Sequence, residues 1–174
     1  ISICKALEKK GLVELEKRNQ DKVIEETSFK SLKKNISYNK EQLIVIKSLK
    51  TAIKSGVYSS NLLHGVTGSG KTEIFIEIIK TVKKLGKCSI VLIPEISLTS
   101  QIAGRFKQVF GDNMALWHSQ LSKSQRAKTW RDINDGTCKI VIGARSAIFS
   151  PVKNLGLVIV DEEHDSSYLS LIHI

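Results

Sequence analysis

The 174-residue chain has few cysteines, no long apolar run and fewer acidic than basic residues. Its three cysteines, Cys4, Cys88 and Cys138, are odd in number and widely spaced, which argues against a disulfide framework or a zinc knuckle. This usage favours a reducing cytoplasm, and Cys88 and Cys138 begin apolar runs in which burial is expected. The longest apolar runs, at 89–93 and 155–160, are far too short to span a bilayer, so no membrane partner is expected.

The shortage of acidic residues leaves the chain strongly basic. It has 27 Lys and Arg against 17 Asp and Glu, a net charge of +10 and a pI of about 9.6. Nucleic acid is the leading partner for such a chain, although charge alone would also suit an acidic membrane surface. Between Arg105 and Lys153 there are nine Lys and Arg against three Asp. Lysines that only solvate helix faces account for part of this excess.

Residues 1–36 are expected to form a separate unit from residues 37–168. The first segment is typical of a partial winged-helix module with a basic linker, and a generic helix plus hairpin fits its residues equally well. In the second segment, apolar strands alternate with amphipathic helices, which predicts an α/β fold with a parallel sheet covered on both faces. The expected strands are 62–63, 89–93, 114–117, 139–142 and 157–160, and the expected helices are 39–55, 72–85, 98–110, 122–134 and 144–149.

The clearest motif lies between the first expected strand and the helix after it. It fits Gly-x-x-x-x-Gly-Lys-[Ser/Thr], the loop that binds nucleoside triphosphate phosphates, and an accidental glycine-rich turn is the alternative. Lys71 is expected to reach the β- and γ-phosphates, and the Thr72 hydroxyl to ligate Mg²⁺. The motif consists of Gly65, Val66, Thr67, Gly68, Ser69, Gly70, Lys71 and Thr72.

A second set of polar residues follows the last expected strand. Asp161 ends this apolar strand, which delivers its carboxylate to the sheet edge where the phosphate loop also lies. Asp161 is therefore expected to hold Mg²⁺ through water, and Glu162 to orient or deprotonate the attacking water. An exposed acidic turn is the alternative for these residues.

Beyond single motifs, the chain resembles a known family of DNA motors. The run from Asp161 to His164 has the Asp-Glu-x-His form of superfamily 2 helicases, the DEAH box. Longer strings resemble the primosomal protein N′ family of replication-restart helicases, in the family's order and spacing over roughly residues 37–168. These strings are Leu62 to Glu73, Pro94 to Gln101, Trp117 to Ser122, Ile142 to Phe149 and Leu155 to Tyr168.

This resemblance implies the first RecA-like lobe of an ATP-dependent 3′→5′ DNA helicase of replication restart. ATP and Mg²⁺ are the implied cofactors, and single-stranded and forked DNA, primosome proteins and replication-restart proteins are the implied partners. Gln42 matches the glutamine that reads adenine, although an exposed polar residue is an equal alternative. Thr99 matches the first DNA-contacting motif, and Arg145 and Ser146 match the second. Another superfamily 2 DNA translocase, or a non-catalytic DNA-binding regulator with a vestigial ATP site, would share some of these features.

The sequence departs from the family in two respects. It contains no match to the family's second lobe with its arginine finger, to its domain that binds DNA 3′ ends, or to its zinc-binding segment, so the chain is expected to be a fragment without zinc ligands. The last six residues, 169–174, are apolar where the family is polar, and they coincide with the translated end of a common sequencing transposon. This tail is expected to be non-native.

Overall fold

The computed structural model describes residues 37–94, 98, 100–166 and 168, all of which belong to one compact unit of the chain. The expected winged-helix segment, 1–36, and the expected non-native tail, 169–174, lie outside the described residues. No helix in the described part is long and apolar enough to cross a membrane. In chain order the elements are α2 (Lys40–Ser55), α3 (Lys71–Lys84), β1 (Cys88–Leu92), α4 (Ser100–Phe110), η1 (Gly111–Asn113), β2 (Met114–Trp117), α5 (Lys123–Asn134), β3 (Ile140–Gly143), η2 (Arg145–Phe149) and β4 (Leu155–Val160).

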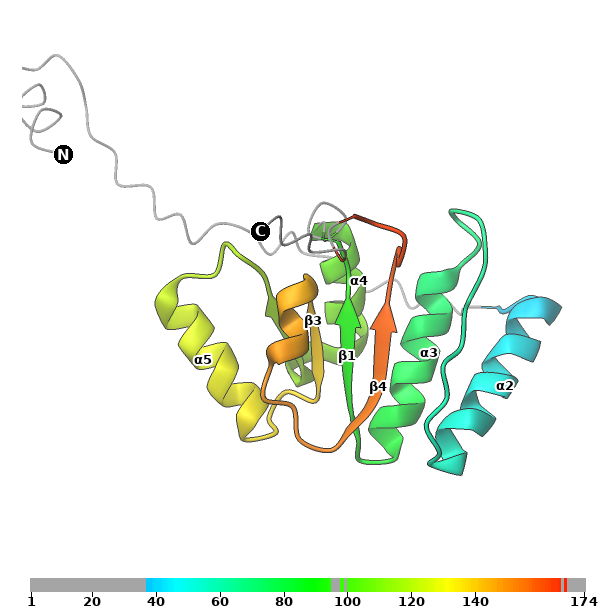
Figure 1. Ribbon diagram of the computed structural model, residues 1–174, viewed down its shortest axis with the longest axis horizontal. Coiled ribbons are helices and arrows are strands. Elements are labelled where there is room, and N and C mark those ends of the chain that lie inside the picture. Colours follow the sequence, from blue (N-terminus) through cyan, green and yellow to red (C-terminus); the bar gives the residue numbers. More distant parts are fainter. Residues whose placement is uncertain (1–36, 95–97, 99, 167, 169–174) are drawn as a thin grey trace, which may run out of the picture. The chain divides into compact units, whose positions relative to one another are not determined.

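The four strands form one parallel sheet in the order β2-β3-β1-β4 (Figure 1). Every residue of β1 and β3 is buried, as expected for central strands covered on both faces. In register, Val91 of β1 lies between Ile142 of β3 and Ile159 of β4. Because all strands run the same way, their carboxyl ends meet at one edge of the sheet, and the predicted α/β class is confirmed.

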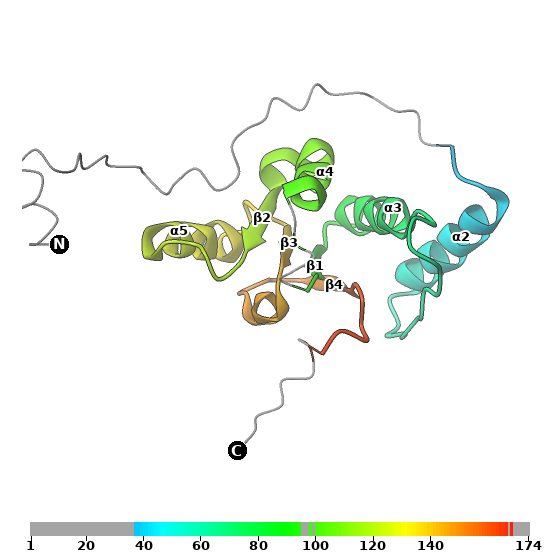
Figure 2. The same cartoon turned by 90° about the horizontal axis from the view of Figure 1, so that it is seen from above.

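Two apolar clusters hold helices against opposite faces of the sheet (Figure 2). On one face, Ile76 and Ile79 of α3 and Phe106 of α4 pack against the strands. On the other face, Ile133 of α5 and Ala147 of η2 cover the central strands. Cys88 and Cys138 are both buried, as the sequence predicts.

Helix α2 packs on the outside of α3 and begins at a capping box. The Asn39 side chain accepts a hydrogen bond from the Gln42 N–H at 2.7 Å, and the Gln42 side chain accepts one from the Asn39 N–H at 3.0 Å. Gly56 ends the helix in a left-handed conformation. Ile46 of α2 then packs against Ile74 and Ile78 of α3, so α2 is anchored to the helix that follows the phosphate loop.

The expected strand at Leu62–Leu63 is wrong. The segment is irregular, Leu62 is 78% exposed, and Leu63 instead packs against the cluster between α2 and α3. A strand needs a hydrogen-bonded neighbour, and no strand of the described part pairs with this two-residue run. The expected helix at 144–149 is a short 3₁₀ helix, and the remaining expected helices and strands within the described part are confirmed to within two residues.

Candidate functional site

The phosphate-loop motif leads directly into the N-terminus of α3. Gly70 is the N-cap residue, and no side chain caps the helix there. Gly68 and Gly70 have φ values of +80° and +86°, which glycine adopts at little cost. An uncapped helix N-terminus preceded by such turns presents backbone N–H groups and positive potential, the combination that binds phosphate. The residues of the loop therefore fit a nucleoside triphosphate.

Gln42 links α2 to the phosphate loop. Its Nε2 donates to the Ser69 carbonyl oxygen at 2.9 Å, while its Oε1 is used in the cap of α2. A Cβ atom added at Gly70 would lie 2.6 Å from this Nε2, so any larger residue there would displace the Gln42 side chain, and the φ of +86° itself favours glycine. Gln42 is thus a half-buried neighbour of the loop rather than an isolated surface residue, and its expected adenine contact stays a prediction.

We expect Gly70→Ala to lower the free energy of unfolding by about 2–3 kcal/mol. About 1–2 kcal/mol comes from the left-handed backbone, and about 1 kcal/mol from the displaced hydrogen bond between Gln42 and Ser69. Gly86→Ala is the matched control, because Gly86 has a φ of +73° and nothing within 4 Å of an added Cβ. Urea unfolding of both variants measures the difference. Equal losses would show that the Gln42 contact contributes nothing.

Lys71 and Asp161 lie close together at the carboxyl edge of the sheet. The Lys71 Nζ donates to the Gly65 carbonyl oxygen at 2.6 Å and to the Val66 carbonyl oxygen at 3.2 Å. The Asp161 N–H donates to the Leu92 carbonyl oxygen at 2.9 Å, which extends the ladder between β4 and β1. Burial and the neighbouring Glu162 raise the pKa of Asp161, and the Lys71 charge lowers it. The fold thus brings the strand-end carboxylate within electrostatic reach of the loop lysine, and the roles expected of both residues stay predictions.

Glu162 is exposed immediately beyond Asp161 and has a φ of +51°. A non-glycine residue rarely adopts this conformation, and such strain concentrates at functional sites. The Glu162 N–H donates to Asp161 Oδ1 at 3.2 Å, and Tyr168 donates from its hydroxyl to the Asp161 carbonyl oxygen at 3.0 Å. Burial, and then the nearby Asp161, Asp165 and Glu162, raise the pKa of Tyr168 to about 12, so its hydroxyl stays protonated as a donor.

These groups fit magnesium bound mainly through a nucleotide and water. In the described part of the chain, no three or more His, Cys, Asp and Glu residues gather as a metal site. Mg²⁺ in nucleotide sites needs only one or two protein oxygens beside phosphates and water. Thr72 in the first turn of α3 and Asp161 at the end of β4 are the residues suited to this role.

An ion pair that the sequence pattern did not reveal joins α3 to α4. Arg105 donates from Nε and Nη2 to the same Glu73 Oε1, at 2.9 and 2.5 Å. Glu73 follows Thr72 directly and its side chain is 22% exposed. Its Oε2 is buried and has no hydrogen-bond partner among the residues that the structure describes. The pair therefore holds the first turn of α3 against α4. The position of Glu73 beside the loop is the only sequence signal that pointed to it.

We expect Arg105→Ala to destabilise the chain by about 1–3 kcal/mol, because Glu73 would keep a poorly solvated charge without its partner. Lys107→Ala on the same helix is the control. Lys107 pairs with the fully exposed Asp112 at 3.5 Å, so its loss is expected to cost less than about 1 kcal/mol. Urea unfolding midpoints measure both. Equal midpoints for the two variants would contradict the structural role of the Arg105 pair.

Two of the three expected DNA-contacting residues lie beyond the carboxyl end of a strand, at the same sheet edge as the phosphate loop. Arg145 and Ser146 are both exposed and open η2, directly after β3. Pro94 follows β1, and its carbonyl oxygen accepts from the Leu98 N–H at 3.0 Å. Thr99 lies outside the described residues. Arg145 and Ser146 follow β3, whereas Asp161 follows β4, and β1 lies between these two strands.

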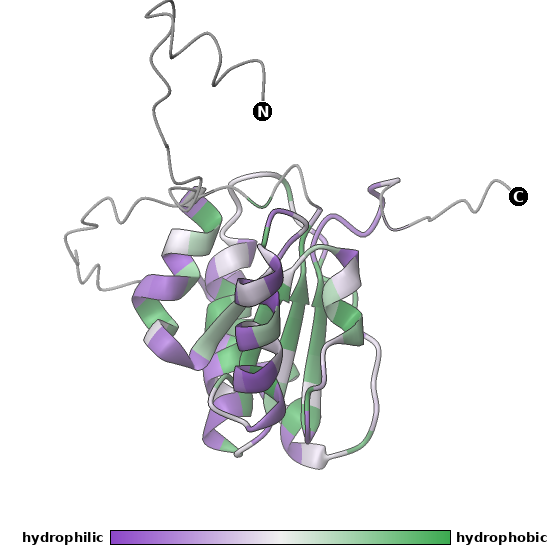
Figure 3. Cartoon of the chain, turned by 90° about the vertical axis from the view of Figure 1, so that its left-hand side faces the viewer, coloured by the Kyte–Doolittle hydropathy of each residue, from purple (hydrophilic) through white to green (hydrophobic). Residues whose placement is uncertain are grey.

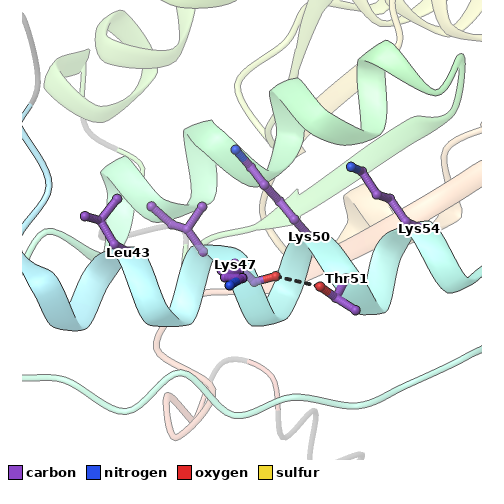
Figure 4. A pocket seen from close by; sticks show the side chains of 6 residues that line it. Leu43, Lys47, Lys50, Thr51 and Lys54 are labelled. Atoms are coloured by element: carbon purple, nitrogen blue, oxygen red, sulfur yellow. Dashed lines mark hydrogen bonds between the residues drawn. The ribbon is translucent and has the colours of Figure 1, made fainter.

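A hollow of about 520 Å³ lies along α2, and its lining residues all belong to that helix and not to the phosphate loop (Figure 4). Three lysines line it, and of these Lys50 is held by Glu77 of α3 at 2.6 Å. Thr51 donates to the Lys47 carbonyl oxygen at 3.0 Å, as in an ordinary helix. The hollow has no carboxylate or uncapped helix end, so the chemistry of triphosphate binding belongs to the loop. Its lining residues are Leu43, Ile46, Lys47, Lys50, Thr51 and Lys54.

Comparison with known proteins assigns the family. The model of the DEAD/DEAH box helicase family matches residues 19–171. The chain is 56% identical over 108 residues to a protein named "Replication restart protein PriA" from Treponema pallidum, covering 62% of this chain and 16% of that protein. Proteins of the same name are 49% identical over 128 residues in Bacillus subtilis (74% and 16%) and 43% identical over 168 residues in Synechocystis (96% and 20%).

The chain thus spans no more than about a fifth of the length of these relatives. The family model covers most of the chain, including both the phosphate loop and the strand that ends at Asp161. The chain therefore belongs to the DEAD/DEAH box helicase family.

Proposed function

We propose that this chain is the ATP-binding lobe of a replication-restart DNA helicase, which couples ATP hydrolysis to 3′→5′ movement on forked DNA. The observation that carries this proposal is the phosphate loop that runs into the uncapped N-terminus of α3, beside β4, whose carboxyl end is followed by Asp161. The names of the relatives, as replication restart proteins, support the place of the complete protein at stalled forks. Primosome and other replication-restart proteins are then its partners.

The mechanism follows from what each side chain offers. The N–H groups at the α3 N-terminus bind phosphate oxygens, and Lys71 exchanges its contacts with the loop carbonyls for the β- and γ-phosphates. Thr72 and Asp161 would hold magnesium, which would supply positive charge against the negative charge that develops during phosphoryl transfer. Glu162 accepts a proton from the attacking water. Gln42 reaches the loop from α2, and in this proposal it contacts the base.

The DNA strand lies across the loops that follow β1 and β3. Thr99 donates its hydroxyl to one phosphate, and Arg145 and Ser146 bind another. The remaining four-fifths of the complete protein supplies the second lobe and the arginine that completes the ATP site. Such an arginine is worth about 10³–10⁵ in rate in related nucleotide hydrolases, so this chain alone is expected to hydrolyse ATP poorly.

The test is ATP hydrolysis and strand separation by the purified complete protein. We expect hydrolysis to rise when single-stranded or forked DNA is added, and expect unwinding of a duplex that carries a 3′ single-stranded tail but not a 5′ tail. Movement without strand separation would favour a different DNA translocase of the superfamily. DNA binding without any ATP hydrolysis would overturn the proposal in favour of a non-catalytic regulator.

A further inference from the structure

Helix α5 presents a basic surface that the proposed site does not use. The helix carries four basic residues and a single acidic residue, Asp132, and its only buried residue is Ile133. The helix is on the side of the molecule turned toward the viewer in Figure 3, where hydrophilic colours dominate its turns. The basic residues, all exposed, are Lys123, Arg126, Lys128 and Arg131.

Folding does not account for this charge. A helix that is polar all round is ordinarily supported by ion pairs along its surface, or it bridges other parts of a protein. None of the four α5 cations forms an ion pair with any described residue, whereas Lys50, Lys80 and Arg105 on the other helices pair with Glu77 or Glu73. The start of α5 is set instead by a capping box between Ser122 and Gln125.

Local contacts hold part of the surface in place. Trp130 of α5 lies against Trp117 of β2, with ring centroids 5.9 Å apart, and the Arg126 guanidinium lies 5.8 Å from the centre of the Trp117 ring. The Arg126 Nη2 also donates to the Ser119 carbonyl oxygen at 3.4 Å. These contacts fix α5 and one of its guanidinium groups before any partner binds. Pre-organisation of this kind lowers the entropy cost of binding.

The surface also has the size and position of a nucleic-acid contact. Positions 123 to 131 cover about 12 Å of helix at 1.5 Å per residue, which matches several phosphates of a DNA strand spaced about 3.4 Å apart along a duplex. Helix α5 begins beyond the carboxyl end of β2, at the edge that bears Arg145. β2 and β4 are the two outer strands of the sheet, so α5 lies across the sheet from the phosphate loop.

We propose that the exposed side of α5 binds the sugar-phosphate backbone of DNA and so extends the contact surface beyond the loops after β1 and β3. The identification of the polyanion as DNA rests on the proposed function. The surface is suited to backbone phosphates rather than to base edges, because lysines on an exposed helix provide charge without fixed hydrogen-bond geometry. Binding there is therefore expected to depend on salt and not on base sequence.

The test compares two variants of the complete protein that carry the same change of charge. In the first, Lys123, Arg126, Lys128 and Arg131 become glutamine. In the control, four exposed lysines on α2 and α3 become glutamine, namely Lys40, Lys47, Lys54 and Lys84. Fluorescence anisotropy without ATP measures the affinity for labelled single-stranded and duplex oligonucleotides between about 50 and 200 mM salt, a range over which phosphate contacts change affinity strongly.

For the α5 variant we expect affinity to fall about tenfold or more relative to the control, and the slope of log K against log salt to become shallower by about two to three. A larger effect on one oligonucleotide would identify the form of DNA that lies on α5. If the fourfold variant has a clearly lower melting temperature, the double variant Lys123→Gln with Lys128→Gln serves instead. Neither of these two lysine side chains makes a hydrogen bond in the described part of the chain. About half the change in slope is then expected.

An affinity and a salt slope equal to those of the control would overturn the proposal and would leave α5 as the site of another partner, such as an acidic protein. The binding readout is independent of ATP hydrolysis. If the salt slope becomes shallower in the α5 variant but the complete protein hydrolyses no ATP, the DNA contact at α5 stands and the proposed function is overturned. If the slope is unchanged but DNA stimulates ATP hydrolysis, the proposed function stands and the DNA contact at α5 is overturned.

Discussion

Replacing Glu162 by glutamine is expected to reduce DNA-stimulated ATP hydrolysis by the complete protein about 10²–10⁴-fold while ATP binding is retained. The amide has nearly the same shape as the carboxylate but cannot accept the proton of the attacking water, and a general base contributes a factor of this order. Glu162 makes no phosphate contact in the proposed mechanism, so affinity is expected to change little. Single-turnover hydrolysis and equilibrium binding of a fluorescent ATP analogue measure the two quantities separately.

Glu163→Gln is the matched control for this experiment. Glu163 is the next residue and is also exposed, and within the described part of the chain its carboxylate lies near the His164 ring alone, at 3.9 Å. Its replacement removes one charge from the same turn without removing the proposed base. A wild-type rate for Glu162→Gln, or an equal loss in both variants, would show that hydrolysis does not depend on a base at this position.

The strand-and-helix pattern could be predicted wherever burial leaves a strong signal in the sequence. The sheet was predictable because Ile90 and Val91 in β1, and Val141 and Ile142 in β3, are buried on both faces and therefore form continuous apolar runs. The start of α2 was predictable because Asn39 is a good cap before an amphipathic run.

Leu62 and Leu63 show where this reasoning fails. Their apolar character is real, and Leu63 is used in packing between α2 and α3. An extended segment becomes a strand only when it is hydrogen-bonded to a neighbouring strand. Among the described residues, none of the four strands of the sheet pairs with Leu62 and Leu63. A run of two apolar residues does not indicate whether a neighbouring strand is present.

Within the candidate site, local features could be predicted from the sequence, whereas contacts between distant residues could not. The position of the loop before α3 and of Asp161 after β4 was predictable, because the residue types and spacing are typical of phosphate and magnesium sites. The roles of these residues stay predictions. The contacts from Gln42 to Ser69 and from Arg105 to Glu73 join residues 27 and 32 positions apart, which no local pattern encodes. Tyr168 gave no pattern of its own, since its hydrogen bond to Asp161 depends on the turn between them.

Lys71→Ala is expected to weaken ATP binding by the complete protein about 10²- to 10⁴-fold. Hydrogen bonds to charged groups are each worth about 1.5–3 kcal/mol, and the lysine is proposed to contact two phosphates of the nucleotide. Lys84→Ala is the control, because Lys84 is an exposed lysine in the last turn of the same helix, and it is expected to bind ATP normally. Isothermal titration calorimetry with ATP and magnesium measures both affinities.

The same variant tests whether Lys71 acts on Asp161. Its charge lowers the pKa of Asp161 against the effects of burial and Glu162, so Lys71→Ala raises that pKa further. A carboxylate must be ionised to hold magnesium. The loss of magnesium-dependent ATP binding on acidification is therefore expected to begin at a higher pH in Lys71→Ala than in Lys84→Ala. Coincident pH profiles would show that the lysine and the carboxylate act independently, and that their closeness at the sheet edge is not functional.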